Sequence, residues 1–171
     1  QGVSSAASDV YKRQGENGAF HNVKEGAIFI DNTTASAKIA RELSEEAKKR
    51  KFGFLDAPVS GGQAGAENGA LTVMIGGEQN HFEQAESIID CYSKKMKLLG
   101  NSGSGQLAKM VNQICIAGLV QGLSEAIRFG QNAGLNMEDV IEVISKGAAQ
   151  SWQMENRYKT MITDKFDYGF A

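Results

Sequence analysis

Short apolar runs alternate with amphipathic stretches over the first hundred residues of the chain. Runs at 26–31, 52–57, 70–77 and 95–100 have the length of strands, and the first reads G-A-I-F-I-D. A strand that is apolar at nearly every position is typical of a sheet with both faces covered. The pattern therefore predicts four strands of one sheet, and the run at 26–31 suits a buried parallel strand.

The stretches between these runs have the period of helices. Residues 33–51 begin with hydroxyl side chains, place Ile39, Leu43 and Ala47 on one face, and end with basic residues. Hydroxyl side chains favour the N-terminus of a helix, and basic side chains stabilise its last turn. This segment therefore carries the signals for both ends of a helix. Residues 78–92 show a similar periodicity. Strands that alternate with helices predict an α/β sheet with helices on its faces.

The alternation stops after about residue 101, and helical periodicity continues alone. Residues 106–132 are apolar nearly all round, which predicts a buried helix rather than a surface one. Two shorter helices are expected at 136–147 and 151–166. We place a domain boundary near residue 101. Residues 1–14 have no periodicity and resemble translated adapter read-through, so we interpret them as a non-native leader.

Composition excludes several classes of protein. The formal net charge is −2, so no basic face for nucleic acid is expected. No apolar run is long enough to span a bilayer, which argues against a membrane partner. The two cysteines have no C-x-x-C spacing, so a cytoplasmic location is expected. The two histidines have no ligand-spaced partner, so we predict no metal.

The segment G-S-G-Q-L-A-K-M-V-N-Q, residues 103–113, has the form of a dinucleotide-binding loop. Such a loop needs a helix of about a dozen residues followed by a strand that ends in an acid. The predicted helix instead continues for about seven turns, so the match is interpreted as accidental. Lys109 and Asn112 share one face of this helix. They are either a lysine extended to solvent beside a surface asparagine, or a lysine whose pKa burial lowers toward that of a general base.

A second glycine-rich segment, D-A-P-V-S-G-G-Q-A-G, begins at residue 56. It places Ser60, Gly61 and Gly62 just past the carboxyl end of a predicted strand, where ligands of open α/β sheets bind. A serine hydroxyl and the N–H groups of two glycines would form a small carboxylate site. The alternative is an ordinary glycine-rich turn.

Together these segments resemble the 3-hydroxyisobutyrate dehydrogenase family, also called β-hydroxyacid dehydrogenases. D-N-T-T at 31–34, D-A-P-V-S-G-G at 56–62, T-V-M-I-G-G at 72–77 and the segment 103–113 occur in the family's order. The resemblance extends over residues 20–171. It implies oxidation of short 3-hydroxy acids, or reduction of semialdehydes, with NAD or NADP. The implied partner is a small hydroxy acid or semialdehyde, with a homo-oligomer in the full-length protein.

The resemblance also implies a fold and a domain organisation. Residues 15–101 correspond to part of an NAD(P)-binding Rossmann domain, namely the C-terminal half of its sheet. Residues 102–171 correspond to a long interdomain helix and part of an all-helical domain. The family's G-x-G-x-x-G loop and a downstream K-D-L segment have no counterpart in this sequence. We therefore expect an internal fragment with an incomplete cofactor site, an aggregation-prone sheet edge and little dehydrogenase activity of its own.

The family's functional residues can be carried over by position. Lys109 corresponds to the catalytic lysine that accepts the substrate hydroxyl proton. Asn112 corresponds to an amide that orients substrate and lysine, and Gln113 stands where some members have a second asparagine. Thr34 corresponds to a hydroxyl near the nicotinamide ribose, although Thr34 or Ser36 could equally cap the following helix. The residues that correspond to the substrate-carboxylate loop are Ser60, Gly61 and Gly62.

Other functions remain open at this point. The substrate could be tartronate semialdehyde, succinic semialdehyde or glyoxylate. A 6-phosphogluconate-type substrate is disfavoured, because no basic cluster for a phosphate accompanies Ser60 or Lys109. The chain could also be a non-catalytic dimerisation module, with the apolar segment S-W-Q-M-E-N-R-Y as its surface.

Overall fold

The computed structural model describes residues 18–166, and the chain divides into two compact units, residues 1–111 and 112–171. The first unit is built on a five-stranded sheet in which β1, β2, β4 and β3 are neighbours in that order, and β5 pairs with β4. The predicted leader, residues 1–14, lies outside the described residues. The predicted division into 15–101 and 102–171 remains a proposal.

The first half of the sheet is parallel. β1 (Ile28–Asp31) and β2 (Gly53–Asp56) pair in parallel, with Asp31 beside Asp56, and α2 (Ala37–Lys49) connects them. Ser36 caps this helix by accepting a hydrogen bond from the Ile39 N–H at 3.1 Å. The cap is therefore Ser36 and not Thr34, whose exposed side chain has no hydrogen-bond partner within residues 18–166.

The second half of the sheet is mixed. β4 (Leu71–Gly77) is antiparallel to both β2 and β3 (Val59–Ser60), and β5 (Ser93–Leu98) is parallel to β4. α3 (Gly62–Glu67) and α4 (Gln79–Asp90) follow β3 and β4, and a 3-10 turn, η1 (Ala19–His21), precedes β1. All four predicted strands are confirmed, whereas the sequence did not predict β3 and α3. Each is too short to show a periodicity.

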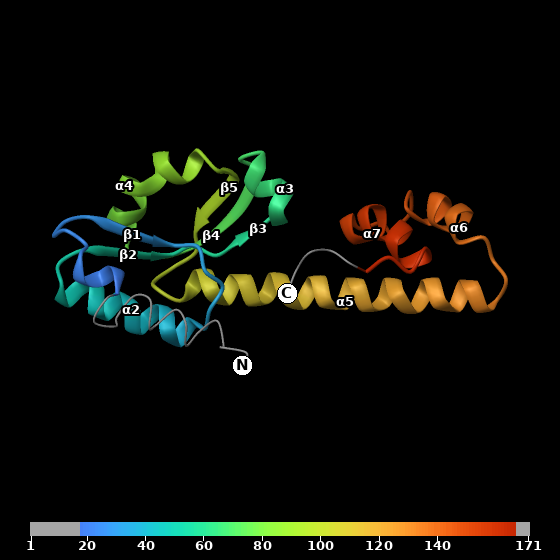
Figure 1. Cartoon of the computed structure of the whole chain (residues 1–171), viewed down its shortest axis with the longest axis horizontal. Coiled ribbons are helices and arrows are strands. Elements are labelled where there is room, and N and C mark those ends of the chain that lie inside the picture. Colours follow the sequence, from blue (N-terminus) through green and yellow to red (C-terminus); the bar gives the residue numbers. More distant parts are fainter. Residues whose placement is uncertain (1–17, 167–171) are drawn as a thin grey trace. The chain divides into compact units, whose positions relative to one another are not determined.

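Two hydrophobic cores cover the two faces of this sheet, with α2 and α4 on opposite sides (Figure 1). Alternate residues of β2 point to opposite faces: Phe54 contributes to the core under α2, and Leu55 to the core under α4. The α2 core is aromatic, with the Phe20 ring in edge-to-face contact with Phe29, Phe52 and Phe54. The burial of both faces confirms the α/β fold predicted from the apolar runs.

The second unit is helical. α6 (Met137–Ile144) and α7 (Trp152–Ile162) are capped by Asn136 and Ser151, whose side chains accept hydrogen bonds from the first turns. The core of this unit is formed by Leu123, Ile127, Met137, Ile141 and Met154. Both helices confirm the segments predicted after residue 135.

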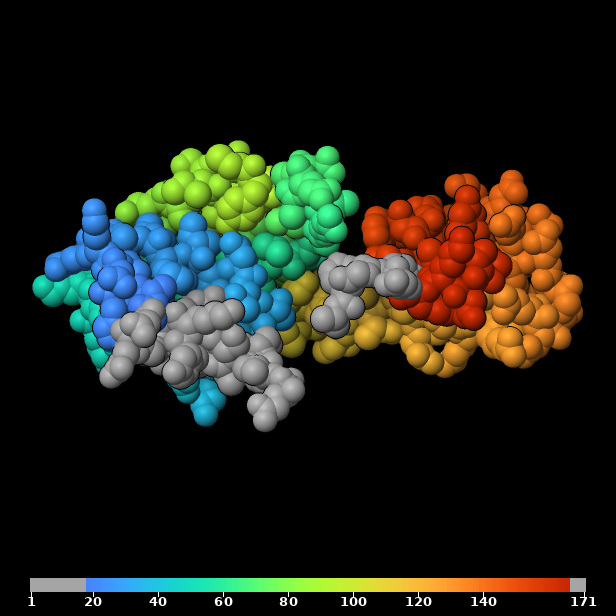
Figure 2. All heavy atoms as spheres, in the orientation of Figure 1, coloured from blue at the N-terminus to red at the C-terminus, as the bar shows by residue number. Residues whose placement is uncertain are grey.

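α5 (Ser104–Asn132) is a single helix of 29 residues, and the prediction that it is buried is wrong for this chain. Its side chains lie largely at the surface (Figure 2), and Ile114 and Phe129 are 72% and 74% exposed. Among the residues of the second unit that the structure describes, Leu123 and Ile127 are the ones of this helix in the buried hydrophobic core, because α6 and α7 cover one stripe of it. Apolar residues on all sides of a helix therefore indicate that its faces favour packing partners. They do not show that the described residues of this chain provide those partners.

α5 is also the longest of the described helices. By length and composition alone, this helix could cross a bilayer.

Candidate active site

Lys109 is a buried lysine on the second turn of α5. Its side chain is only 9% exposed, and its ammonium nitrogen donates a hydrogen bond of 2.7 Å to the Val59 carbonyl oxygen. Desolvation lowers the pKa of Lys109 from its ordinary value. Of the two sequence-based interpretations of this lysine, the geometry fits the buried one.

The Val59 contact places the lysine beside the second predicted segment. Val59 and Ser60 form β3, which pairs with Val73 and Thr72 of β4. The next two residues, Gly61 and Gly62, have φ values of 140° and 62°, which favour glycine. The chain can therefore turn directly after Ser60 and leave an exposed glycine loop next to the residue that binds Lys109. The first unit thus brings together four of the predicted residues: Lys109, Ser60, Gly61 and Gly62.

Asp56, at the carboxyl end of β2, fixes the start of α5. This fully buried carboxylate accepts hydrogen bonds from the backbone N–H groups of Gly103 at 2.7 Å and Gln106 at 3.0 Å. An anion at a helix N-terminus satisfies N–H groups that have no partner within the helix. Desolvation raises the pKa of Asp56 although these N–H groups counteract it. The lysine-bearing helix is therefore anchored directly to a central strand.

Two glycines allow this close contact. Gly103 has a φ of 93°, and a side-chain carbon added at Gly105 would collide with the carbonyl oxygens of Met74 and Asp56. Gly76 faces the same place, since a carbon added there would lie 2.6 Å from Asp56 Oδ1. The G-x-G pattern thus permits helix-to-sheet contact, in agreement with the prediction that it is not a phosphate loop.

Gln106 connects α5 to the D-N-T-T segment. Its fully buried side chain accepts a hydrogen bond from the Ala35 N–H at 2.9 Å and donates one to the Thr33 carbonyl at 2.7 Å. The exposed Thr34 lies between these two peptide groups. The loop that follows β1 is therefore fixed to the same helix as Lys109.

Asn112 is not joined to this cluster by a hydrogen bond. It belongs to the second unit, and its side-chain amide donates to Gln113 Oε1 at 3.1 Å. Sequence reasoning missed the roles of Asp56 and Gln106, although both lie in segments it singled out. The available signals were an acid that closes a buried strand and a glutamine three residues before Lys109 on an apolar helix.

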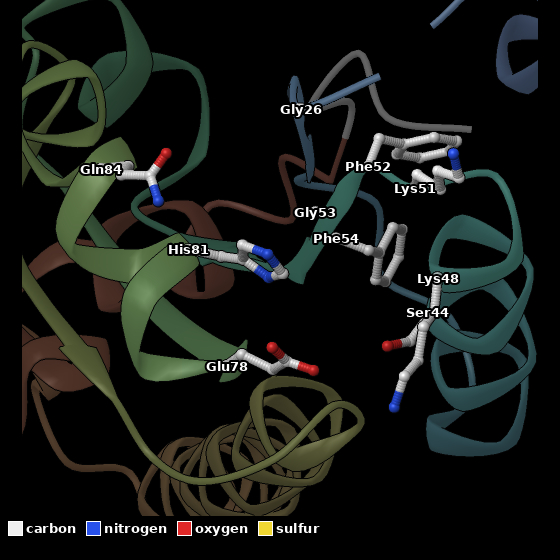
Figure 3. A pocket seen from close by; sticks show the side chains of 10 residues that line it. All are labelled: Gly26, Ser44, Lys48, Lys51, Phe52, Gly53, Phe54, Glu78, His81 and Gln84. Carbon is white, nitrogen blue, oxygen red and sulfur yellow. The ribbon is translucent and has the colours of Figure 1, made fainter. Parts of the chain in front are cut away.

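A separate cavity of about 430 Å³ lies at the opposite ends of the parallel strands, near Gly53 (Figure 3). His81 and Glu78 extend into it from one side, and Ser44 and Lys48 from the other. A lysine faces a carboxylate here, and the cavity's other lysine, Lys51, already pairs with Glu25 at 3.4 Å. The charges therefore largely cancel, and none of the predicted site residues lines this cavity.

An α/β sheet with a glycine-rich loop at its strand ends is the architecture of many nucleotide-binding domains. Residues 3–100 match the family described as the NAD binding domain of 6-phosphogluconate dehydrogenase. Residues 103–171 match the family described as "NAD-binding of NADP-dependent 3-hydroxyisobutyrate dehydrogenase". The chain belongs to the 3-hydroxyisobutyrate dehydrogenase family of NAD(P)-dependent oxidoreductases.

Individual relatives agree with this assignment. The chain is 62% identical over 157 residues to an uncharacterized oxidoreductase of Shewanella frigidimarina, covering 92% of this chain and 54% of the relative. It is 36% identical over 141 residues to a probable mitochondrial 3-hydroxyisobutyrate dehydrogenase of Dictyostelium discoideum, covering 82% of this chain and 44% of the relative. The solved 3-hydroxyisobutyrate dehydrogenase of Mycobacterium tuberculosis is 27% identical, with a TM-score of 0.78, covering 88% of this chain and 54% of that one.

The covered fractions show how much of each relative this chain represents. The chain spans about half the length of the curated relatives it matches. The family assignment, the fold class and NAD or NADP as the cofactor follow from these matches.

Proposed function

We propose that this chain forms the catalytic part of an NAD(P)-dependent dehydrogenase for short 3-hydroxy acids, with Lys109 as the general acid/base. The observation that supports the proposal is the buried Lys109, whose nitrogen lies 2.7 Å from the carbonyl of the residue that precedes Ser60. A lysine at its ordinary pKa is almost fully protonated at neutral pH, and burial shifts it toward the neutral amine that accepts a proton.

The neighbouring loop gives the substrate a place to bind. Ser60 offers a hydroxyl, and the glycine loop at Gly61 and Gly62 lets the chain approach a small anion closely. A carboxylate held there would keep the adjacent carbinol near Lys109. In the oxidation direction Lys109 removes the hydroxyl proton, and in the reduction direction it returns that proton. Asn112, three residues further along α5, is the proposed orienting amide.

The residues that the chain contributes also fit a nicotinamide cofactor. The exposed Thr34 hydroxyl lies just beyond the carboxyl end of β1, where nucleotides bind in open α/β sheets. We propose that this hydroxyl contacts the nicotinamide ribose. When bound, the cofactor supplies the hydride acceptor, and hydride transfer is chemistry that the side chains cannot provide.

The proposed substrate class is a short acid with a hydroxyl on carbon 3. The Mycobacterium tuberculosis relative was solved with L-serine, a compound of this class. Tartronate semialdehyde, succinic semialdehyde and glyoxylate remain alternatives in the reductive direction. A cytoplasmic location, a homo-oligomer in the full-length protein, and the absence of nucleic-acid and membrane partners are also proposals. The Dictyostelium discoideum relative is named as mitochondrial.

A chimera tests the general acid/base. The matching 157 residues of the Shewanella frigidimarina relative would be replaced by those of this chain, so that a complete enzyme is assayed. Reduction of NAD and NADP would be followed with L-serine and L- and D-3-hydroxyisobutyrate, and the reverse reaction with the three alternative substrates. We expect Lys109→Ala to lower kcat by about 100-fold or more, the usual contribution of a general acid or base.

The matched control is Lys97→Ala, which changes an exposed lysine of β5 and should leave kcat unchanged. Full activity of a folded Lys109→Ala chimera would contradict the proposal. Absence of activity in both the parent and the variant, with both folded, would favour the non-catalytic dimerisation module. The 171 residues assayed alone should give little turnover, because they span about half of a family member.

A further inference from the structure

Gln106 is a fully buried polar side chain whose purpose the proposed reaction does not explain. It lies in the first turns of α5, and its exposed fraction is 0%. Burial of an amide is unfavourable unless its donors and acceptor find partners. The partners that Gln106 finds are both peptide groups of one short loop.

The two hydrogen bonds have opposite directions. Gln106 Oε1 accepts from the Ala35 N–H at 2.9 Å, and Gln106 Nε2 donates to the Thr33 carbonyl at 2.7 Å. One planar amide therefore binds the peptide groups on both sides of Thr34. Such a two-point contact fixes the orientation of the loop as well as its distance from the helix.

The base of the same loop is fixed from the sheet. The Thr33 N–H donates to Asp31 Oδ1 at 2.9 Å, and Asn32 Nδ2 donates to the Ala57 carbonyl at 2.8 Å. These contacts hold the loop to the ends of β1 and β2 but do not involve α5. Gln106 adds the connection to the helix, three residues before Lys109 and therefore on nearly the same helical face.

We infer that Gln106 is a positioning residue that fixes the Thr34 hydroxyl relative to the Lys109 amine. The inference rests on the proposed function, in which Thr34 contacts the nicotinamide ribose and Lys109 the substrate. Because Gln106 is fully buried, it would not contact either ligand itself. It sets the distance between the cofactor-binding loop at Thr34 and the proton-transfer group of Lys109, which are 75 residues apart in the chain.

The direction of the two hydrogen bonds explains why a glutamine is needed. An ionised glutamate at this position could still accept from the Ala35 N–H, but its second oxygen would face the Thr33 carbonyl without a proton. A protonated glutamate could donate to that carbonyl and restore the contact. Gln106→Glu therefore makes the loop contact dependent on pH, whereas a side chain that only fills space has no such dependence.

The experiment compares Gln106→Glu with the parent in the Shewanella frigidimarina chimera. The dissociation constant for NADPH would be measured by fluorescence titration from pH 5.5 to pH 9, together with KM, kcat and Tm. At high pH we expect the NADPH dissociation constant and the cofactor KM to rise about tenfold, the effect of one lost hydrogen bond. The KM for the hydroxy acid should change less, and the increase for NADPH should shrink as the pH falls.

Gln121→Glu is the matched control. Gln121 lies on the same helix and is exposed, and its amide donates a hydrogen bond of 2.7 Å to the side chain of Glu125 rather than to a peptide group. This variant should leave NADPH binding unchanged at every pH. An NADPH dissociation constant of Gln106→Glu equal to that of the parent, or raised by the same factor across the pH range, would overturn the inference.

The outcome for Lys109→Ala separates the two proposals. Loss of activity in Lys109→Ala together with unchanged NADPH binding in Gln106→Glu would refute only the role of Gln106. Full activity in Lys109→Ala would refute the proposed function. In that case, the NADPH titration would still show whether Gln106 positions the cofactor loop.

Discussion

Three polar side chains decide how the candidate site is built: Asp56, Gln106 and Lys109. All three are buried, and each has a hydrogen-bond partner. Burial moves the pKa of Asp56 up and that of Lys109 down, because in both cases it disfavours the charged form. For Lys109 this shift favours proton transfer. For Asp56 it opposes the charge that holds the start of α5, so stability there depends on pH.

Asp56→Asn should change the pH dependence of stability. Because the pKa of Asp56 is raised on folding, the folded state holds its proton more tightly than the unfolded state. The contribution of this group to the unfolding free energy is therefore greatest at acidic pH and falls as the pH rises from about 4 through the raised pKa. The stability difference between the parent and Asp56→Asn should shrink over that range.

At pH 7, Asp56→Asn should lower the unfolding free energy by about 1–3 kcal/mol. One backbone N–H of α5 would then face the NH₂ group of the asparagine instead of a carboxylate oxygen. Urea unfolding at several pH values measures both effects. Asp90→Asn, at an exposed position at the end of α4, is the control. If the unfolding free energies of Asp56→Asn and the parent changed in parallel with pH, the raised pKa of Asp56 in the folded state would be contradicted.

At the scale of elements, the start of α5 is held so closely to the sheet that Gly105 has no room for a side chain. Gly105→Ala should destabilise the protein by about 1–3 kcal/mol, because the added carbon meets backbone oxygens that cannot move aside. Gly118→Ala on the same helix should instead stabilise by about 0.5–1 kcal/mol, since nothing lies within 4 Å of the added carbon.

Thermal or urea unfolding of the two variants measures the difference. Equal effects of the two substitutions would mean that the contact between α5, Met74 and Asp56 is not close in solution. Gly105→Ala should also lower kcat in the chimera, since Lys109 lies one turn further along the same helix and would be displaced with it.

The elements also show how far the sequence predicts this molecule. Long periodic segments such as α2 and the apolar strand β2 were predicted, because each one carries its own pattern. β3 was not, because two residues have no period and its pairing with β4 is set by distant positions. For the site, the segments were recognisable, but the bonds of Asp56 and Gln106 join residues about 50 and 70 positions apart.

For the molecule as a whole, the main feature is the exposed apolar surface of α5. The other residues of 18–166 cover only a small part of that surface. The chain spans about half the length of the curated relatives it matches. The apolar side chains of α5 outside its short buried stripe therefore contribute little to the stability of this chain alone.

Ile114→Ala and Ile127→Ala test this difference on one helix. Ile114 is 72% exposed, so its truncation should change the unfolding free energy by less than about 0.5 kcal/mol. Ile127 is 3% exposed in the core with α6 and α7, so its truncation should cost about 2–5 kcal/mol. A large loss for Ile114→Ala in the isolated chain would mean that another copy covers the helix, which light scattering would detect.

The anchors of the site have one more property in common, namely the kind of group to which they bind. Lys109 binds the carbonyl of Val59, Gln106 binds peptide groups beside Thr34, and Asp56 binds backbone N–H groups of α5. A main-chain partner survives nearly any substitution at its own position. Sequence drift can therefore replace most neighbours of the site while its geometry persists, provided that these three side chains and the closely packed glycines are retained.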